Sequence, residues 1–224
     1  MSEIEKNTVE SKNQLDVNRY VTYENENGSG LRFMFVGNSI TLHGPKSDIG
    51  WSGNWGMAAS SKEKDYVHIL IRKIQAVTPD PSFCICQAAE WERNYINGKS
   101  VYNFYQKARD YKPNVIIMRI VENCPALKPG DFEIFKKEYA DFLDYLKSDT
   151  DAKVILTTGF WRHSADDAIR EVAGDYNFEL CELGDLGEKS EMRADGLFEH
   201  SGVAHHPGDK GMQAIAERIF EKIF

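Results

Sequence analysis

A serine and a histidine far apart in the sequence are the residues whose types could carry nucleophilic chemistry. Ser39 follows the apolar run 31–36 and a Gly-Asn step. His206 precedes Pro207 at the start of the last amphipathic stretch. A serine hydroxyl is a weak nucleophile until a base removes its proton, and an imidazole is the commonest such base. If the fold brings these two side chains together, they predict acyl-transfer chemistry.

Strand-like and helix-like stretches alternate along the chain and must position this pair. Apolar runs typical of buried strands lie at 31–36, 82–87, 115–120, 153–157 and 178–183. Helix-like stretches lie at 65–75, 101–110, 131–148, 165–173 and 210–224. Five strand–helix pairs predict an α/β fold, a three-layer α/β/α sandwich around a five-stranded parallel sheet. Ligand sites gather at the carboxyl ends of parallel strands, and Ser39 falls at such an end.

Length and composition predict a single domain at 31–224, preceded by a polar N-terminal extension, 1–30, that we expect to be partly disordered. The formal net charge of −8 disfavours a nucleic-acid partner, because phosphate binding requires a basic face. No apolar stretch approaches the roughly 20 residues that span a bilayer, so we expect no membrane partner. Residues 1–18 lack the apolar core of a signal peptide, which predicts a cytoplasmic protein, although a trimmed export signal stays open.

Polar and aromatic residues after other strands are candidates to line the same cleft. Asn123 follows the run 115–120, where its carboxamide can donate to a developing oxyanion; a turn-forming Asn is the alternative. Aromatic faces suit sugar and acyl surfaces, and an arginine suits hydroxyls or carboxylates. The candidate substrate-binding residues are Trp51, Trp55, Trp91 and Arg93. The alternatives are loop packing for the tryptophans and a surface salt bridge with Glu90 or Glu92 for the arginine.

These stretches resemble the SGNH (GDSL-type) hydrolases, a family of esterases and lipases with a flavodoxin-like α/β/α fold. Gly37-Asn38-Ser39-Ile40 resembles the first family block, Gly-Asp-Ser-Leu/Ile, with Asn in place of Asp. Glu122-Asn123 resembles the third block, whose Asn donates to the oxyanion. His206-Pro207 resembles the last block, which holds the catalytic His. The resemblance extends over residues 31–224.

The resemblance implies a serine hydrolase acting on ester bonds of a small-molecule ester or an acylated sugar, with acetyl groups as the candidate acyl groups. His206 would take the proton of Ser39, and Asn123 would bind the oxyanion together with the backbone amides of Ser39 and Ala89. Ala89 lies in the stretch that matches the second block, where the family has a glycine. The resemblance implies no cofactor and no metal.

One departure from the family concerns the acid that orients the histidine. The family has an Asp three residues before the His, and here that position is Val203. Glu199 is our candidate acid, with Asp195 or a backbone carbonyl as alternatives. Losing the acid of a triad costs about 10⁴ in rate when nothing replaces it. A catalytically decayed, carbohydrate-binding relative is therefore the alternative function.

Two further classes of function are weaker. A metal site would draw on the neighbouring side chains of Glu199, His200, His205 and His206, but their spacing is not that of ligands on one helix face. Nucleotide binding is disfavoured, because Gly28-Ser29-Gly30 precedes the first strand, whereas a phosphate-binding glycine loop follows it.

Overall fold

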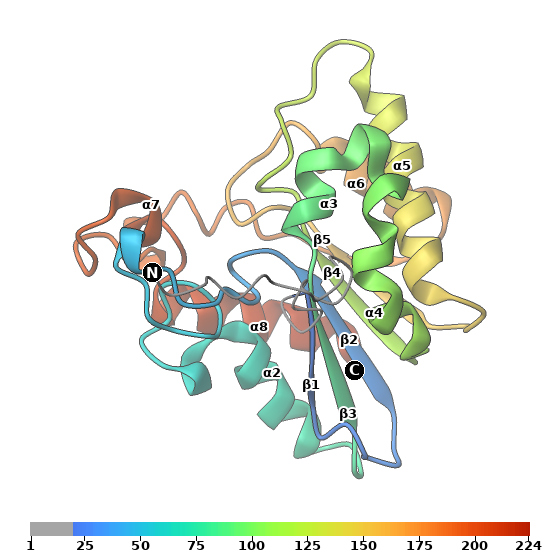
Figure 1. Cartoon of the computed structure of the whole chain (residues 1–224), viewed down its shortest axis with the longest axis horizontal. Coiled ribbons are helices and arrows are strands. Elements are labelled where there is room, and N and C mark those ends of the chain that lie inside the picture. Colours follow the sequence, from blue (N-terminus) through green and yellow to red (C-terminus); the bar gives the residue numbers. More distant parts are fainter. Residues whose placement is uncertain (1–19) are drawn as a thin grey trace, which may run out of the picture.

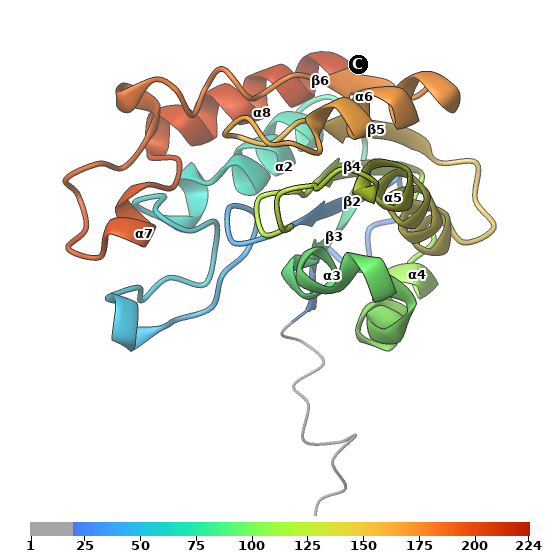
Figure 2. The ribbon, with the colours of Figure 1, turned by 90° about the horizontal axis from the view of Figure 1, so that it is seen from above.

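A six-stranded sheet lies between two layers of helices in the computed structural model, which describes residues 20–224 (Figures 1 and 2). The strand order is β1-β3-β2-β4-β5-β6. The strands are β1 (Val21–Glu24), β2 (Arg32–Gly37), β3 (Ser82–Gln87), β4 (Val115–Arg119), β5 (Lys153–Thr157) and β6 (Glu179–Cys181). The predicted α/β/α sandwich and its five parallel strands are confirmed.

The predicted strand count is wrong by one, because β1 adds an antiparallel edge strand beside β3. Only Val21 of its four residues is buried, so β1 lacks the continuous apolar run by which the other strands were recognised. β1 also lies within 1–30, so the sheet begins earlier in the chain than the expected domain boundary at residue 31. The part of the expected extension at 1–19 lies outside the described residues.

The helices cover the two faces of the sheet unequally. α2 (Tyr66–Gln75) and α8 (Asp209–Ile223) pack side by side on one face, against Phe33 and Phe35 of β2. The other face, which receives Met34 and Val36, is covered by α3 (Ala89–Asn94), α4 (Gln106–Asp110), α5 (Asp131–Lys147) and α6 (Asp166–Asp175). Alternate side chains of a strand point to opposite faces, so a nearly all-apolar β2 is required here.

The remaining helices are short. They are the 3-10 helices η2 (Ser47–Ile49), η3 (Lys62–Lys64), η4 (Tyr95–Tyr105) and η5 (Ser190–Met192), and the single turn α7 (Ser201–Ala204). Among the residues that the structure describes, no helix is both long and apolar enough to cross a membrane.

A small apolar cluster ties the long crossover after β2 to the segment before α8. Trp51, Met57 and Ala58 of the crossover pack against Ala194 and Val203. In both views the crossover and α7 lie beside each other, beyond the carboxyl end of β2 (Figures 1 and 2). This cluster, which we call the Trp51 cluster, fixes the late loop that carries His206 next to the turn that carries Ser39.

Candidate active site

Ser39 and His206 meet at the carboxyl end of β2. The Oγ of Ser39 lies 2.8 Å from Nε2 of His206, across 167 positions of sequence. The Ser39 turn is closed by the amides of Thr41 and Leu42, which both donate to the carbonyl of Asn38. The crossover supports it from outside, since a backbone amide there, at position 57, donates to the carbonyl of Ser39.

Glycine is required at the end of β2. A side-chain carbon at Gly37 would lie 1.7 Å from Oγ1 of Thr41. The Thr41 hydroxyl cannot move away freely, because it is buried and hydrogen-bonded to the hydroxyl of Tyr66 on α2 at 2.7 Å. The close approach of the turn to the strand therefore depends on Gly37.

His206 is held as a neutral base by a backbone carbonyl. Its Nδ1 lies 2.6 Å from the carbonyl oxygen of Gly202 on α7. That oxygen can only accept, so Nδ1 carries the proton and Nε2 is left as the acceptor for the Ser39 hydroxyl. Burial lowers the pKa of His206 to about 4, so the ring is uncharged at neutral pH. The tautomer and the charge state are therefore those that a general base needs.

Trp161, which was not among the predicted site residues, packs against the imidazole of His206 and so restricts the orientation of that ring. Its ring packs edge-on against His206, with 6.0 Å between ring centroids, and stacks on His205 at 5.4 Å. Trp161 lies in the loop after β5, on the same edge of the sheet as Ser39. A tryptophan soon after a predicted strand was the available signal, but this segment carries no motif that marks it.

A buried polar network lies directly behind Ser39. Asn38 donates through Nδ2 to Glu92 (2.9 Å) and to Glu122 (2.5 Å). Arg119, at the end of β4, has no exposed surface and donates to Oδ1 of Asn38 and to Glu122, each at 2.5 Å. The backbone amide of Phe160 also donates to Glu122. The residue before Ser39 is thus fixed by both of its side-chain polar atoms.

The two carboxyl groups of this network differ in their pKa. Burial opposes ionisation of Glu122, but the charge and hydrogen bonds of Arg119 outweigh it and lower the pKa of Glu122. Burial, together with the negative charge of Glu122, raises the pKa of Glu92. Glu122 therefore forms the ion pair with Arg119. Glu92 is the carboxyl group that accepts hydrogen bonds only from amide N–H groups among the described residues.

The three predicted oxyanion donors differ in whether a protein acceptor already binds their N–H groups. Within the described residues, the amide of Ser39 donates to no protein acceptor. Nδ2 of Asn123 donates to Oε2 of Glu92 at 2.6 Å, which leaves its second N–H. The amide of Ala89 donates to the side chain of Gln87 at 3.2 Å, so this predicted donor is already occupied.

Nδ1 of His206 is bonded to a carbonyl and not to the expected orienting acid. Glu199 is exposed, and within the described residues it makes no hydrogen bond or ion pair. The alternative Asp195 pairs with Arg193 at 2.6 Å. The backbone-carbonyl alternative is what the structure contains, and Val203 is buried in the Trp51 cluster, where a carboxylate would have no partner.

The metal alternative also finds no support. His206 uses one ring nitrogen on Ser39 and the other on a carbonyl. Over residues 20–224, no group of three or more His, Cys, Asp or Glu side chains is arranged to hold a metal ion.

Most of the predicted substrate-binding residues are structural. Trp91 has no exposed surface and stacks on Phe142 in the core, with 4.9 Å between ring centroids, so its prediction is wrong. Trp51 is 4% exposed and packs within the Trp51 cluster, which also contradicts its assignment. Trp55 is half-buried and donates to a loop carbonyl. Arg93 is exposed, and its guanidinium lies 3.9 Å from the carboxylate of Glu90. This contact is the surface salt bridge that the sequence offered as the alternative to substrate binding.

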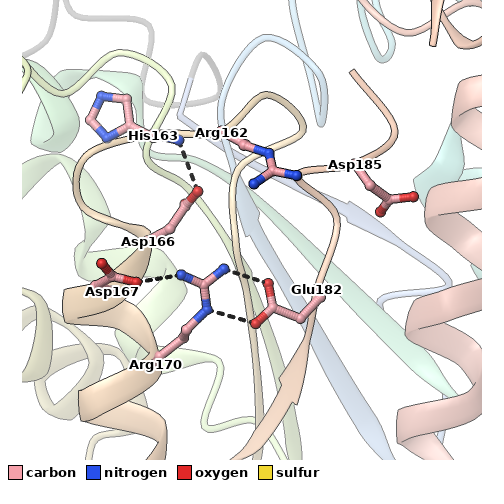
Figure 3. A pocket seen from close by; sticks show the side chains of 8 residues that line it. Arg162, His163, Asp166, Asp167, Arg170, Glu182 and Asp185 are labelled. Carbon is pink, nitrogen blue, oxygen red and sulfur yellow. Dashed lines mark hydrogen bonds and ion pairs between the residues drawn. The ribbon is translucent and has the colours of Figure 1, made fainter. Parts of the chain in front are cut away.

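A separate polar pocket of about 360 Å³ lies after β5 and β6, and it does not include Ser39 or His206 (Figure 3). The guanidinium of Arg170 lies between Asp167 and Glu182, and Asp166 accepts from the amide of His163. Two arginines and four carboxyl groups line this pocket, and its lining contains no serine, threonine or cysteine that could act as a nucleophile. The candidate reactive centre is therefore the Ser39–His206 pair.

No protein-family model matches the sequence, and no curated protein is similar to it in sequence. Solved structures are similar in fold. One is a two-domain esterase active on acetylated mannans, 16% identical with a TM-score of 0.55, covering 89% of this chain and 50% of that one. The chain thus spans half the length of that esterase.

Two other solved structures are similar to this chain in fold to the same degree. LAE5, an α/β hydrolase from the metagenome of Lake Arreo, Spain, is 17% identical with a TM-score of 0.55, covering 89% of this chain and 97% of that one. A family two carbohydrate esterase from Clostridium thermocellum is 17% identical with a TM-score of 0.55, covering 86% of this chain and 63% of that one. Since every one of these identities is below 20%, the likenesses show the shared α/β/α fold and nothing finer.

Proposed function

We propose that the protein is a serine esterase that removes short acyl groups, with acetyl esters of carbohydrates as its substrate class. The observation that carries the proposal is the 2.8 Å contact between the Ser39 hydroxyl and the uncharged Nε2 of His206. A nucleophile and a base within hydrogen-bond reach, with the base oriented by a third group, are the signature of covalent acyl transfer. Here the third group is the carbonyl of Gly202.

The reaction proceeds in two steps. Oγ of Ser39 attacks the ester carbonyl while its proton passes to Nε2 of His206, and the same proton then leaves with the alcohol. The tetrahedral oxyanion is stabilised by the amide of Ser39 and the second N–H of Asn123. Water, deprotonated by His206, then attacks the acyl-enzyme and releases the acid.

The carbonyl of Gly202 orients His206 but brings no full negative charge to the imidazolium formed in each step. A dyad of this kind lacks the charge that a carboxylate supplies in a triad, and the burial of His206 lowers the pKa of its imidazole. Because this pKa is low, His206 remains unprotonated well below neutral pH and can still accept the proton of Ser39 there. We infer an esterase whose histidine does not limit activity on the mildly acidic side.

The substrate class is supported by the neighbours in fold. The two-domain esterase is described as active on acetylated mannans, and the enzyme from Clostridium thermocellum as a carbohydrate esterase. Their sequence identity to this chain is 16–17%, so the acylated sugar is part of the proposal.

The test is hydrolysis of p-nitrophenyl acetate and release of acetate from acetylated mannan and xylan, by wild type and by Ser39→Ala. Loss of the nucleophile is expected to lower kcat by about 10³-fold or more. Ser52→Ala, at an exposed serine of the crossover, is the matched control and should leave kcat unchanged. Equal activity of wild type and Ser39→Ala would refute the esterase. Binding of acetylated glycans without any hydrolysis would favour the carbohydrate-binding alternative instead.

A further inference from the structure

Glu92 is a fully buried carboxyl group with no cation of its own. Its Oε1 accepts from Nδ2 of Asn38 at 2.9 Å and from the amide of Val121 at 2.6 Å. Its Oε2 accepts from Nδ2 of Asn123 at 2.6 Å, and the amide of Asn123 approaches Oε1 at 3.4 Å. These partners are donors only, so the ionised form of Glu92 is the one that satisfies them. A buried carboxylate is costly, which makes its presence here informative.

The partners of Glu92 lie on both sides of the site. Asn38 immediately precedes the nucleophile Ser39 at the end of β2, and Asn123 follows β4 and carries the proposed oxyanion donor. Glu92 reaches both from α3, which packs on one face of the sheet. One carboxylate therefore spans the two strand ends between which the tetrahedral intermediate would form.

We propose that Glu92 is a positioning residue that holds the Ser39 turn and the Asn123 side chain in the relative arrangement needed to bind the oxyanion. This assignment rests on the proposed esterase. Because a carboxylate can only accept, it determines that the NH₂ end of the Asn123 amide, and not its oxygen, faces α3. A glutamine at position 92 could accept or donate, so it would allow the Asn123 amide to turn over and would leave one donor unmet.

Protonation of Glu92 would disrupt the same contacts, because its new O–H would face donors only. The ionisable groups around it are Glu122 and Arg119 at the end of β4, Cys124 in the loop that follows, and Tyr139 on α5. Burial raises the pKa of the Cys124 thiol and of the Tyr139 hydroxyl, so both stay neutral. The positive charge of Arg119 is taken up by Glu122. The groups around Glu92 therefore do not fully offset the rise in its pKa that burial causes.

The sign of the pH effect follows from these contacts. The active form needs Glu92 ionised, and burial raises its pKa above the ordinary value for a glutamic acid. Burial lowers the pKa of His206 to about 4. As the pH falls, Glu92 should therefore be protonated before His206 is. The acid limb of kcat in the wild type is then set by Glu92 and lies above the limb that His206 alone would give.

The experiment compares wild type, Glu92→Gln and the matched control Glu90→Gln between pH 4 and 8, by acetate release from p-nitrophenyl acetate. Glu90 lies two residues earlier on α3, is half-buried, and pairs with the exposed side chains of Arg93 and Asn94 on the same helix. We expect Glu92→Gln to lower kcat about 10²-fold, as removal of one oxyanion donor does, with KM changed little. Its acid limb should move down toward the pKa of His206, and Glu90→Gln should behave as wild type.

A Glu92→Gln enzyme with wild-type kcat, or with an unmoved acid limb, would overturn the assignment. The wild-type profile tests it even if the variant does not fold: an acid limb that coincides with the titration of the His206 imidazole, followed by NMR, also overturns it. The two proposals fail differently. A wild type without esterase activity overturns both, whereas an active wild type indifferent to Glu92 overturns only this one.

Discussion

Replacing Asn38 by aspartate should damage this protein, although aspartate is the residue that the SGNH family block has at this position. Nδ2 of Asn38 donates to two buried carboxyl groups, Glu92 at 2.9 Å and Glu122 at 2.5 Å. Asn38→Asp removes both hydrogen bonds and places a third carboxylate against the first two, with Arg119 as the one cation that bonds to this side chain among residues 20–224. The network would change from one excess negative charge to two.

The cost can be worked out from these contacts. A hydrogen bond to a charged group contributes about 1.5–3 kcal/mol, so losing two costs about 3–6 kcal/mol. Arg119 already donates to Oδ1 of Asn38, so its attraction to the new charge offsets part of this. We expect a net loss of at least about 2 kcal/mol, a large fraction of the 5–15 kcal/mol typical of a folded domain. kcat should fall as well, because Ser39 is the next residue.

The assay is urea unfolding at pH 8 and pH 5, with kcat on p-nitrophenyl acetate beside it. The new carboxyl group is buried among negative charges, so its pKa in the folded state is raised, and stability is lost as the pH rises. The defect should therefore be larger at pH 8 than at pH 5. Asn103→Asp, at an exposed position of η4, is the control and should change stability by less than about 0.5 kcal/mol. An Asn38→Asp protein as stable as wild type at both pH values would refute the described network.

Three further substitutions test the orientation of His206. Glu199→Gln should leave kcat unchanged, because Glu199 is exposed and Nδ1 of His206 is held by a carbonyl; a large loss of kcat would restore Glu199 as the orienting acid. Val203→Asp should not complete a triad but should lower the unfolding free energy, since Val203 has no exposed surface and lies in the Trp51 cluster; higher kcat in this variant would contradict that. Trp51→Ala should cost about 3–5 kcal/mol in urea unfolding and lower kcat, because the cluster fixes the His206 loop; an unchanged midpoint would speak against this role.

The sequence predicts the sheet and the reactive pair for a clear physical reason. Strands covered on both faces must be apolar throughout, so β2 and β4 stand out as runs, and the residues after each parallel strand must lie at one edge of the sheet. That reasoning places Ser39 correctly at the edge where His206 is found. It misses β1, because an edge strand buried on one side needs no such run.

The partners within the site could not be read from residue types. The orienting group of His206 is the carbonyl of Gly202, and every residue has a carbonyl, so no pattern reveals which one is used. The sequence offers Glu92 only as one of two surface partners, with Glu90, that Arg93 could pair with, because most glutamates are exposed. Its burial depends on how α3 packs on the sheet, and that is a property of the tertiary structure.

Covalent labelling with a fluorophosphonate, with the adduct located by mass spectrometry, tests most directly whether the serine is activated. We expect one adduct in the wild type, on Ser39, that is absent in Ser39→Ala and forms far more slowly in His206→Ala. A wild type that takes up no label, or one that is labelled just as fast without the imidazole, would contradict it.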